Sequence, residues 1–540
     1  MFVDLEGVES GTVVEADVVI IGAGAAGIAM ARRLARTPLR VVLLESGGLK
    51  PNAAAQALNE GTNLGLPYYP LTQSRSRGFG GTTATWSGRN IPLDPVDFTR
   101  RAWVPHSGWP VSYDTMLPFF HEASAVMNVG QGSYGALWDE VGVPDPALDP
   151  ASFVVRFWRI RAERLGERYR DELQRSHSVT VLLGGTATEL LASGDGRTVS
   201  GARVRTLGGR SFELRARHFV LATGGIENAR LLLASDARER GGIGNGQGLV
   251  GRFFMEHPKC RTATLQATDP YRMLEVWRQH YPRSGPRLWP SIVSTPEVQA
   301  RHGILNSSLA IYFRSLPGVT EAASRIGTAI KQRRRPAMGD LLALAPVLHE
   351  VPANLVRRFV RRRSFIVRPT ALYVLTRGEQ APNPDSRVVL STERDALGQR
   401  RADLDWRLSS LDKHSAKVMT ELLGSEFTRL GLGKVAPDGW LLDGTADWPL
   451  EDTEGDHHTI LQGGHHHIGT TRMGDNPRTA VVDADCRVFG KENLYVAGSS
   501  VFPTSGWANP TLTIVALALR LADHLAVQAV AAPMPVADAA

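Results

Sequence analysis

Residues 16–45 read ADVVIIGAGAAGIAMARRLARTPLRVVLLE, and this stretch decides the fold. The run DVVII is continuously apolar, as in a strand that is buried on both faces of a sheet. A glycine-rich turn and a helix follow, and Thr37-Pro38 ends the helix because proline disfavours the α conformation in the residue before it. A second apolar strand, RVVLL, leads to Glu45. The pattern predicts a βαβ unit within a parallel α/β sheet.

The glycines of this unit have separate physical roles. Gly22 permits a tight turn, Gly24 lets the backbone approach a pyrophosphate, and Gly27 allows the helix to pack closely on the strand. The N-terminus of the helix offers unpaired N–H groups to the phosphates, and Glu45 can accept hydrogen bonds from a ribose diol. The unit therefore predicts dinucleotide binding. A purely structural glycine turn is the alternative.

Length and composition describe a globular protein with more than one domain. The chain has 540 residues, of which 43% are hydrophobic and 21% charged, and its net charge is +7. This length exceeds what one hydrophobic core usually supports. Cys260 and Cys486 form no CxxC pair, and the N-terminus lacks the features of a signal peptide. We therefore expect a cytoplasmic location, and residues 512–530 to form a core helix because charges interrupt that apolar run.

A second glycine-rich loop, RGFGGTTATWSGRN, covers residues 77–90. A surface turn is one interpretation of this composition. The other, which we prefer, is a loop along the flat ring of the cofactor, in which Trp86 packs and Ser87 makes a polar contact.

Residues 179–220 alternate in period two between turns, which predicts an antiparallel meander. At residues 218–233, HFVLATGGIENARLLL then repeats the order of buried strand, glycine turn and helix. The chain thus returns to the parallel sheet after an excursion. The nucleotide-binding domain is therefore predicted to be discontinuous.

From residue 258 to residue 453 the pattern changes to strand-like pieces, SSLAIYF, FIVRPTALYVLTRG, SRVVLS and ADLDWRL, which predict one large sheet. Residues 318–363 between them are basic and helical in tendency, although Pro346 and Pro352 interrupt their apolar face. A solvated arm or lid is one interpretation, and docking on a membrane surface or a partner is the other. Nucleic-acid binding is not expected, because no recognised module accompanies the charge.

Histidines cluster at residues 457–458 and 465–467. A metal site is not predicted, because no ligand follows at the helical spacing of zinc motifs. A histidine beside a hydride-accepting ring is the sharper hypothesis, since an ordinary pKa near 6.5 lets it take a proton from an alcohol. Asn509 precedes Pro510 and an apolar helix, so by itself it suggests a helix cap. In one pocket with the histidine it would instead donate a hydrogen bond to the developing alkoxide.

Several separated motifs follow one another in a characteristic order: GAGAAG with Glu45, GFGGTTATW, VLATGGIENARLL, GLVGRFFMEHP, EQAPNPDSRVVLS, HHIGTTRMG and ENLYVAGSSVFPTSGWANPTLT. Together they resemble the glucose–methanol–choline (GMC) oxidoreductases along most of the chain. Within that family the chain is most similar to the pyranose oxidase-like and sugar dehydrogenase branches. Residues 131–178 and the arm at 318–363 match no family motif.

The resemblance implies FAD and a fold of class α/β with an α+β second domain. The implied domains are a discontinuous Rossmann-like FAD-binding domain (12–130, 180–257 and 455–532) and a substrate domain (131–179 and 258–454) on a large, mostly antiparallel sheet. The second includes the helical basic arm 318–363, and residues 533–540 would form a flexible tail.

The same resemblance implies the site. Matched through the HxxGT and NPT patterns, the general base falls on His466 and its hydrogen-bonding partner on Asn509. The implied reaction is oxidation of a hydroxyl group of a sugar, glycoside or polyol by hydride transfer to flavin N5, with oxygen or another acceptor taking the electrons. The candidate cofactor-binding residues are Gly22, Gly24, Gly27, Glu45, Gly80, Gly81, Thr85, Trp86, Ser87, Thr223, Gly224, Gly498, Ser499, Asn509, Pro510 and Thr511.

Two other classes of protein share part of the pattern. A flavin monooxygenase-type enzyme would share the first βαβ unit but would not need His466 and Asn509. A flavin-binding interaction protein would use the basic arm to dock and would turn over no substrate.

One departure from the family predicts how the cofactor is held. Pyranose oxidases carry a histidine, covalently bonded to the flavin, immediately before the tryptophan of the second loop, and that position here is Thr85. The FAD is therefore predicted to be non-covalent. Acid precipitation of the protein should release the yellow cofactor into the supernatant, as its absorbance would show. Colour retained in the pellet would contradict this prediction.

Overall fold

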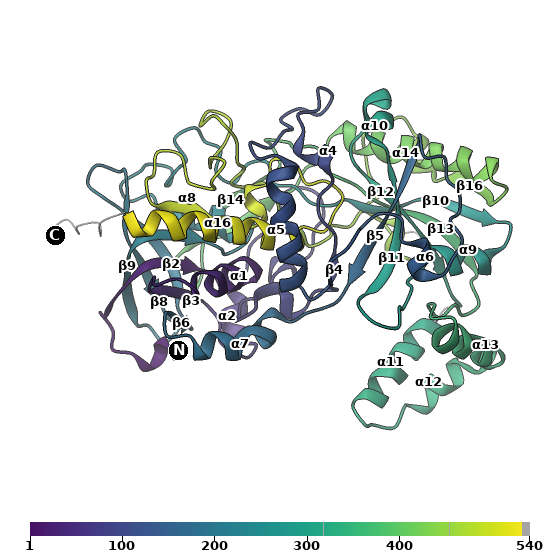
Figure 1. The fold of residues 1–540 in the computed structure, drawn as a ribbon, viewed down its shortest axis with the longest axis horizontal. Helices are drawn as coiled ribbons and strands as arrows, with labels where there is room; N and C mark the ends of the chain where they lie inside the picture. The colour runs from purple at the N-terminus through teal and green to yellow at the C-terminus, as the bar shows by residue number, and fades with distance from the viewer. Residues whose placement is uncertain (317, 453, 532–540) are drawn as a thin grey trace.

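The computed structural model describes residues 1–316, 318–452 and 454–531 (Figure 1). The tail expected at residues 533–540 lies outside these ranges. The described chain forms two large sheets and a small one. The first sheet with its helices makes up one half of the molecule, and the second large sheet makes up the other (Figure 1).

The first sheet has the strand order β1-β6-β3-β2-β9-β8-β7, with β17 beside β9. Its strands are β1 (Phe2–Asp4), β2 (Val13–Ile21), β3 (Val41–Glu45), β6 (Val179–Leu183), β7 (Thr186–Ala192), β8 (Val199–Arg205), β9 (Ser211–Leu221) and β17 (Leu494–Val496). β2, the helix α1 (Ala25–Leu34) and β3 form the predicted βαβ unit, with β2 and β3 parallel. β9 and β17 pair in parallel on the other side of β2, so the chain does return to this sheet.

The meander predicted at residues 179–220 is correct only in part. β7, β8 and β9 are antiparallel neighbours, as predicted. β6, however, pairs in parallel with β3 and with β1. Its residues VTVLL are mostly buried, and a strand that is covered on both faces is typical of a parallel sheet.

The long helix α16 (Thr511–Ala531) packs against α1 and α5 (Tyr113–Val126) beside this sheet (Figure 1). Residues 511–528 of it are apolar enough to cross a membrane by length and composition. Leu512, Val515 and Leu525 are nevertheless fully buried in the protein core, so α16 is a core helix as expected. The other helices outside the arm are α2 (Ala53–Ala57), α3 (Leu71–Ser74), α4 (Pro95–Phe98), α6 (Trp138–Val141), α7 (Leu165–Arg175), α8 (Glu227–Ala234), α9 (Pro270–Trp277), α10 (Pro296–His302), α14 (Ser410–Arg429) and α15 (Gly439–Leu442).

The second large sheet is antiparallel, in the order β16-β10-β13-β12-β11-β5-β4. Its strands are β4 (Arg89–Asn90), β5 (Phe153–Ile160), β10 (Lys259–Ala267), β11 (Arg287–Ser294), β12 (Ser308–Arg314), β13 (Ala371–Arg377) and β16 (Gly433–Pro437). The predicted strands SRVVLS and ADLDWRL do not join it. They become β14 (Arg387–Arg394) and β15 (Arg400–Asp405), a separate hairpin closed by a turn in which the Gly398 N–H donates to the Asp395 carbonyl.

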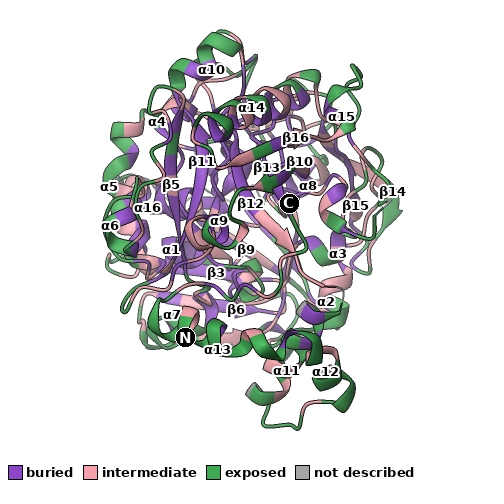
Figure 2. Ribbon diagram, turned by 90° about the vertical axis from the view of Figure 1, so that its right-hand side faces the viewer, coloured by how far each residue is buried: buried purple, intermediate pink, exposed green. Residues whose placement is uncertain are grey.

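The arm at residues 318–363 consists of α11 (Val319–Lys331), α12 (Met338–Ala343), α13 (Val351–Leu355) and short turns between them. Pro346 and Pro352 stand where the segments change, so the single long apolar face suggested by the sequence does not form. The arm projects from the second half of the molecule and is largely exposed (Figure 2). Its root is held by an ion pair of Arg357 with Glu275 at 3.1 Å and by Arg358, which lies 3.5 Å over the ring of Tyr281.

A buried ion pair joins two segments that are far apart in the sequence. Arg101, in the loop after α4, donates to both carboxylate oxygens of Glu379, just beyond β13, at 2.7 and 2.5 Å. The side chains are 1% and 0% exposed. The Asn306 N–H also donates to Glu379, at 2.8 Å. Because water reaches neither charge, the charge of Arg101 and the charge of Glu379 must compensate each other.

Substitution Glu379→Gln should lower the free energy of unfolding by about 3–5 kcal/mol, because it leaves the Arg101 guanidinium buried without a counter-charge. A lower midpoint of urea unfolding would show this loss. In the control Glu393→Gln, the removed carboxylate is 67% exposed, and we expect a change below about 1 kcal/mol. Equal midpoints for Glu379→Gln and the unsubstituted protein would contradict the argument.

Candidate functional site

A cavity of about 670 Å³ takes its walls from both large sheets. Cofactor and small-molecule sites usually occupy about 300–1,000 Å³. His466 and Asn509 line this cavity, and so do all the predicted cofactor-binding residues except Gly27 and Gly80. No described residue of the arm lines it, so the lid interpretation of the arm receives no support.

The glycine turn after β2 fits a dinucleotide. Gly22 has a φ of +109°, and a Cβ there would lie 2.5 Å from the Ala222 carbonyl oxygen. A Cβ on Gly27 would overlap the Gly22 carbonyl oxygen. Gly24, in contrast, has open space at its Cβ position, borders the cavity, and precedes α1 without a side-chain cap. The start of α1 is thus free to receive the phosphates of FAD.

Glu45 is engaged with the backbone of three segments. Its carboxylate accepts hydrogen bonds from the N–H groups of Ala23 at 3.0 Å, Gly47 at 2.9 Å and Gly78 at 2.9 Å. The side chain therefore ties β3, the first glycine turn and the second glycine-rich loop together. It also borders the cavity, and its hydrogen bond to a ribose diol stays a prediction.

The second glycine-rich loop lies directly on the first. The Gly80 N–H donates to the Ala23 carbonyl at 2.9 Å. Gly81 has a φ of +53°, and a Cβ there would come within 2.9 Å of the Gly24 Cα. Only glycines allow this contact between two turns, which explains why both loops are rich in them.

Beyond this contact the loop presents Thr85, Trp86 and Ser87 to the cavity, as expected for a loop along the cofactor. The Trp86 Nε1–H donates to the Glu163 carbonyl at 3.0 Å, which fixes the indole. The Thr85 hydroxyl donates to the Thr82 carbonyl at 3.3 Å.

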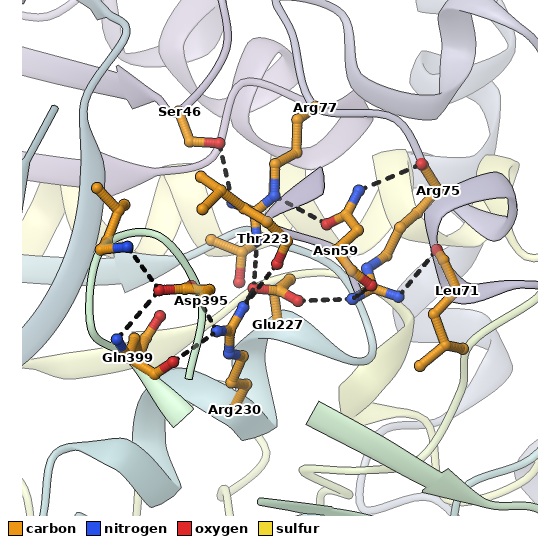
Figure 3. Close-up of polar contacts among 12 residues, drawn as sticks. Ser46, Asn59, Leu71, Arg75, Arg77, Thr223, Glu227, Arg230, Asp395 and Gln399 are labelled. Carbon is orange, nitrogen blue, oxygen red and sulfur yellow. Dashed lines mark hydrogen bonds and ion pairs between the residues drawn. The ribbon is translucent and has the colours of Figure 1, made fainter. Parts of the chain in front are cut away.

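Buried charges hold the same loop from behind (Figure 3). Arg75 and Arg77 contact the two carboxylate oxygens of Glu227 in α8, at 2.8 and 2.6 Å. Arg230 reaches Glu227 at 3.3 Å and Asp395 at 2.7 Å. Burial would raise the pKa of Glu227, but Arg77, Arg230 and Arg75 lower it well below the usual range. Glu227 therefore stays ionised and anchors the loop to α8.

The carboxyl ends of β9 and β17 supply Thr223, Gly224, Gly498 and Ser499 to the cavity wall. Ligands of open α/β sheets bind at such strand ends. The Ser499 hydroxyl donates to the His467 carbonyl at 2.6 Å, so β17 also positions the histidine loop.

A chain of hydrogen bonds crosses the opposite wall. Nη1 of Arg377, at the end of β13, donates to Oδ1 of Asn509 at 3.3 Å. Nδ2 of Asn509 lies 3.1 Å from Nε2 of His466, and Nδ1 of His466 lies 2.6 Å from Nδ1 of His257. Nε2 of His257 lies 2.7 Å from the Gly506 carbonyl oxygen.

The two ends of this chain determine every proton in it. A guanidinium can only donate, so the oxygen of Asn509 faces Arg377 and its NH₂ faces His466. A carbonyl can only accept, so His257 carries its proton on Nε2 and accepts on Nδ1. His466 must then carry its proton on Nδ1. Nε2 of His466 is left unprotonated on the cavity wall.

The charge states agree with this assignment. Burial, followed by Arg377, lowers the pKa of His257 to about 4. Burial, followed by His257 and Arg377, lowers the pKa of His466 well below its usual range. Both rings are therefore neutral at pH 7, and the unprotonated Nε2 of His466 accepts a hydrogen bond from the Asn509 NH₂ group.

Glu256 clamps the loop that carries this base. Its fully buried carboxylate accepts hydrogen bonds from the Tyr68 hydroxyl at 2.7 Å, from the His257 N–H at 2.8 Å, and from the N–H groups of Gly464 and His466. Burial raises the pKa of Glu256 to about 7, although these donors oppose the rise. One side chain thus positions both histidines of the chain.

The neighbours of His466 have different surroundings. His465 stacks on Tyr69 with ring centroids 3.9 Å apart. His467 is buried, and its backbone lies where a side chain on Gly225 would have to be. Neither imidazole belongs to the hydrogen-bond chain described above.

The histidine pair 457–458 lies apart from the cavity wall. Ligand atoms of Asp456, His457 and His458 come within 4.8 Å of one another. Nδ1 of His458 is already 3.1 Å from the Asp456 carboxylate and 3.0 Å from the Tyr373 hydroxyl. The arrangement is explained by these hydrogen bonds without a metal.

Asn509 does not act as the simple helix cap that its sequence context suggests. It lies two residues before the first residue of α16, and its side chain is directed at Arg377 and His466. Glu256, His257 and Arg377 were not predicted as site residues. Glu256 and His257 stand in the motif MEHP, and Arg377 closes the apolar strand LYVLTR. A charged residue within an otherwise apolar run was the sequence signal that could have identified them as site residues.

Comparison with known proteins finds a matching family profile and full-length relatives. The profile of the GMC oxidoreductases matches residues 382–518, and that of the lycopene cyclase proteins matches the βαβ region 17–66. The fructose dehydrogenase large subunit of Gluconobacter japonicus is 24% identical, over 96% of this chain and 98% of its own length. Paromamine 6'-oxidase of Streptomyces fradiae is 25% identical, over 94% and 91%.

Solved structures share the fold. A formate oxidase superposes with a TM-score of 0.55 and 17% identity, over 96% of this chain and 99% of its own. A fungal aryl-alcohol oxidase gives a TM-score of 0.56 and 16% identity, over 95% and 99%. The resemblance to the GMC oxidoreductases inferred from the motifs is thereby confirmed, and the chain is an FAD-dependent enzyme that acts on a CH–OH group.

Proposed function

We propose that the enzyme oxidises a hydroxyl group of a sugar, glycoside or polyol, with His466 as the general base and Asn509 as its hydrogen-bonding partner. The observation that carries this proposal is the hydrogen-bond chain from Arg377 to Gly506, which leaves Nε2 of His466 unprotonated beside the cavity. FAD, when bound, accepts a hydride from the carbon that bears the hydroxyl group.

In this reaction the residues of the protein move a proton. A substrate hydroxyl within hydrogen-bond reach of Nε2 of His466 gives its proton to that atom. The O–H and C–H bonds break, a C=O bond forms, and two electrons leave with the hydride. His466 gains its second N–H while Nδ1–H keeps its bond to His257, so the ring does not have to turn.

Asn509 and Arg377 favour the charge that develops on the substrate oxygen. The NH₂ group of Asn509 lies 3.1 Å from Nε2 of His466, so a hydroxyl group that reaches this atom also meets the amide donor, and Arg377 holds the amide in that orientation. Fixed donors and a buried positive charge are most effective where water is excluded. The same charge lowers the pKa of His466, which keeps the base unprotonated before the substrate arrives.

The names of the relatives support the substrate class and leave the electron acceptor open. One is called a fructose dehydrogenase subunit and another a paromamine 6'-oxidase, so both act on hydroxylated carbohydrates by name. A C-glycoside 3-oxidase of Microbacterium trichothecenolyticum is 48% identical over 62 residues, 11% of this chain. Oxygen and another acceptor both remain candidates.

Two free, buried thiols, Cys260 and Cys486, support the cytoplasmic location that we also propose.

For the arm we propose docking on an anionic membrane surface. Residues 318–363 contain 10 Lys and Arg against 3 Asp and Glu, and 10 − 3 = +7 equals the net charge of the whole chain. Apolar side chains accompany the charge, and the following are more than half exposed: Ile330, Met338, Leu342, Leu348, Phe359 and Val360. Exposed apolar and basic side chains on short helices suit the interface of an anionic leaflet, since the apolar groups insert and the cations pair with the headgroups.

Substitution His466→Ala should leave FAD bound but slow its reduction by substrate by about 10²–10⁴-fold, because the proton acceptor is lost. Anaerobic bleaching of the flavin absorbance over a panel of sugars, glycosides and polyols would measure this rate. His457→Ala, whose side chain is 69% exposed, is the matched histidine control and should bleach normally. Unchanged bleaching in His466→Ala would refute the assignment of the base.

The triple substitution R333Q/R334Q/R335Q should weaken binding to phosphatidylserine-containing vesicles by about 100-fold, because each basic residue near the surface contributes about 1 kcal/mol. Co-sedimentation with these vesicles, and with neutral phosphatidylcholine vesicles, would measure it. R238Q/R240Q removes exposed charge outside the arm and should bind normally. If the unsubstituted protein fails to prefer anionic vesicles, the docking proposal is wrong.

A further inference from the structure

Three cationic side chains share the cavity wall next to the base: Arg89, Lys259 and Arg377. Lys259 opens β10 and Arg377 closes β13, and the two are direct partners in that antiparallel pair. The guanidinium carbons of Arg89 and Arg377 lie 5.6 and 5.4 Å from the ring of Trp158. The three residues therefore form one cluster on the second sheet.

The described residues provide no ion-pair partner for this cluster. Among the residues that the structure describes, none of the three cations forms an ion pair. Arg377 donates to the neutral Oδ1 of Asn509 at 3.3 Å, and Lys259 to the neutral Oε1 of Gln462 at 3.4 Å. Like charges placed directly opposite each other in an antiparallel pair destabilise a sheet. No direct ion pair within the described part of the chain offsets this repulsion.

A fourth cation stands behind the wall. Arg278 lies 5.0 Å from the ring of Trp289 and 5.1 Å from that of Tyr312. Its Nε and Nη1 atoms are buried and have no hydrogen-bond partner. Contact with aromatic faces stabilises a cation but leaves its charge in place. Arg278 thus adds to the positive potential of the cluster.

Neighbouring groups respond to this potential. Burial would raise the pKa of Tyr312, but Arg89, Lys259 and Arg377 lower it below the usual value. Burial lowers the pKa of Lys259 to about 8 and that of Arg377 to about 9, with Arg89 contributing to both. Glu256 opposes the fall in the pKa of Arg377 without reversing it. The lowered pKa of the Tyr312 phenol, beside cations that make no ion pair, shows the excess of positive charge at this wall.

The phosphates of FAD have a separate place. The glycine turn at the start of α1 belongs to the first sheet, whereas β4, β10 and β13 lie in the other half of the molecule (Figure 1). The cations instead surround the side of the cavity that holds the base, since Arg377 is bonded to the partner of His466.

We propose that the substrate is acidic, a hydroxylated carbohydrate whose carboxylate, phosphate or sulfate group is bound by Arg89, Lys259 and Arg377 while a hydroxyl group reaches His466. This inference rests on the proposed function and narrows its substrate class. Guanidinium groups bind planar or tetrahedral oxyanions through paired N–H donors, and the lysine adds a point charge. The bound anion would supply the counter-charge that the sheet lacks.

The test compares matched acidic and neutral compounds on the FAD-loaded enzyme. D-glucuronate, D-glucose 6-phosphate and D-glucose 6-sulfate are each set against D-glucose, and methyl glucuronide against methyl glucoside. Dissociation constants come from calorimetry and rates from anaerobic bleaching. We expect at least one acidic compound to bind about tenfold or more tightly than its neutral counterpart. The acidic compound that binds most tightly shows whether the site prefers a carboxylate, a phosphate or a sulfate group.

Substitutions separate charge from shape. Lys259→Met should reduce the preference for the acidic compound by about tenfold, and Lys259→Arg should retain it. Sulfate alone should compete for the site in the unsubstituted protein and less well in Lys259→Met, whether or not a sugar is oxidised.

Two failures have different meanings. If neutral compounds bind and bleach as well as acidic ones, the acidic substrate is wrong and the proposed oxidation stands. If no compound of either series bleaches the flavin, the proposed oxidation is wrong, and sulfate competition alone decides whether the anion site exists. Absence of sulfate competition together with equal affinities would overturn the inference.

Discussion

The hydrogen bond from Arg377 to Asn509 is the contact on which the chemistry of this site depends. An amide can present either its oxygen or its NH₂ group to a histidine, and only a neighbour that cannot accept removes the choice. With the guanidinium at one end and the Gly506 carbonyl at the other, the intervening groups have one consistent proton arrangement. That arrangement leaves Nε2 of His466 unprotonated on the cavity wall, where it accepts a hydrogen bond from Asn509.

The residues of the hydrogen-bond chain come from four distant parts of the sequence, and buried contacts bring them together. Glu256 holds the backbone beside both histidines, and Arg101 with Glu379 joins the end of β13 to the loop after α4. These carboxylates have little contact with water, so their full strength is available for positioning. These buried contacts hold the residues of the site in place, and removing them would lower the stability of the protein.

Positive charge is concentrated in two places that have different surroundings. In the arm it lies on an exposed, partly apolar surface, where water compensates it. In the cavity wall the charge of Lys259 and Arg377 faces a partly buried space with neutral neighbours. The exposed charges of the arm cost little free energy and can attract many anionic partners. The buried charges of the cavity wall cost more, because burial without a counter-ion penalises a charge, and they favour a ligand that fits the cavity. Both proposals about ligands follow from this contrast.

The sequence by itself determined the βαβ unit, the steric need for glycine at Gly22 and Gly27, and the resemblance to the GMC oxidoreductases, because these depend on local backbone geometry and on the order of short motifs. It also placed His466 and Asn509 in one pocket through the family resemblance. It could not show that Asn509 faces Arg377, that His257 completes the chain, or that β6 pairs in parallel with β3. Those features depend on contacts between segments far apart in the chain. Only tertiary structure decides which donors and acceptors meet, and therefore where the protons are.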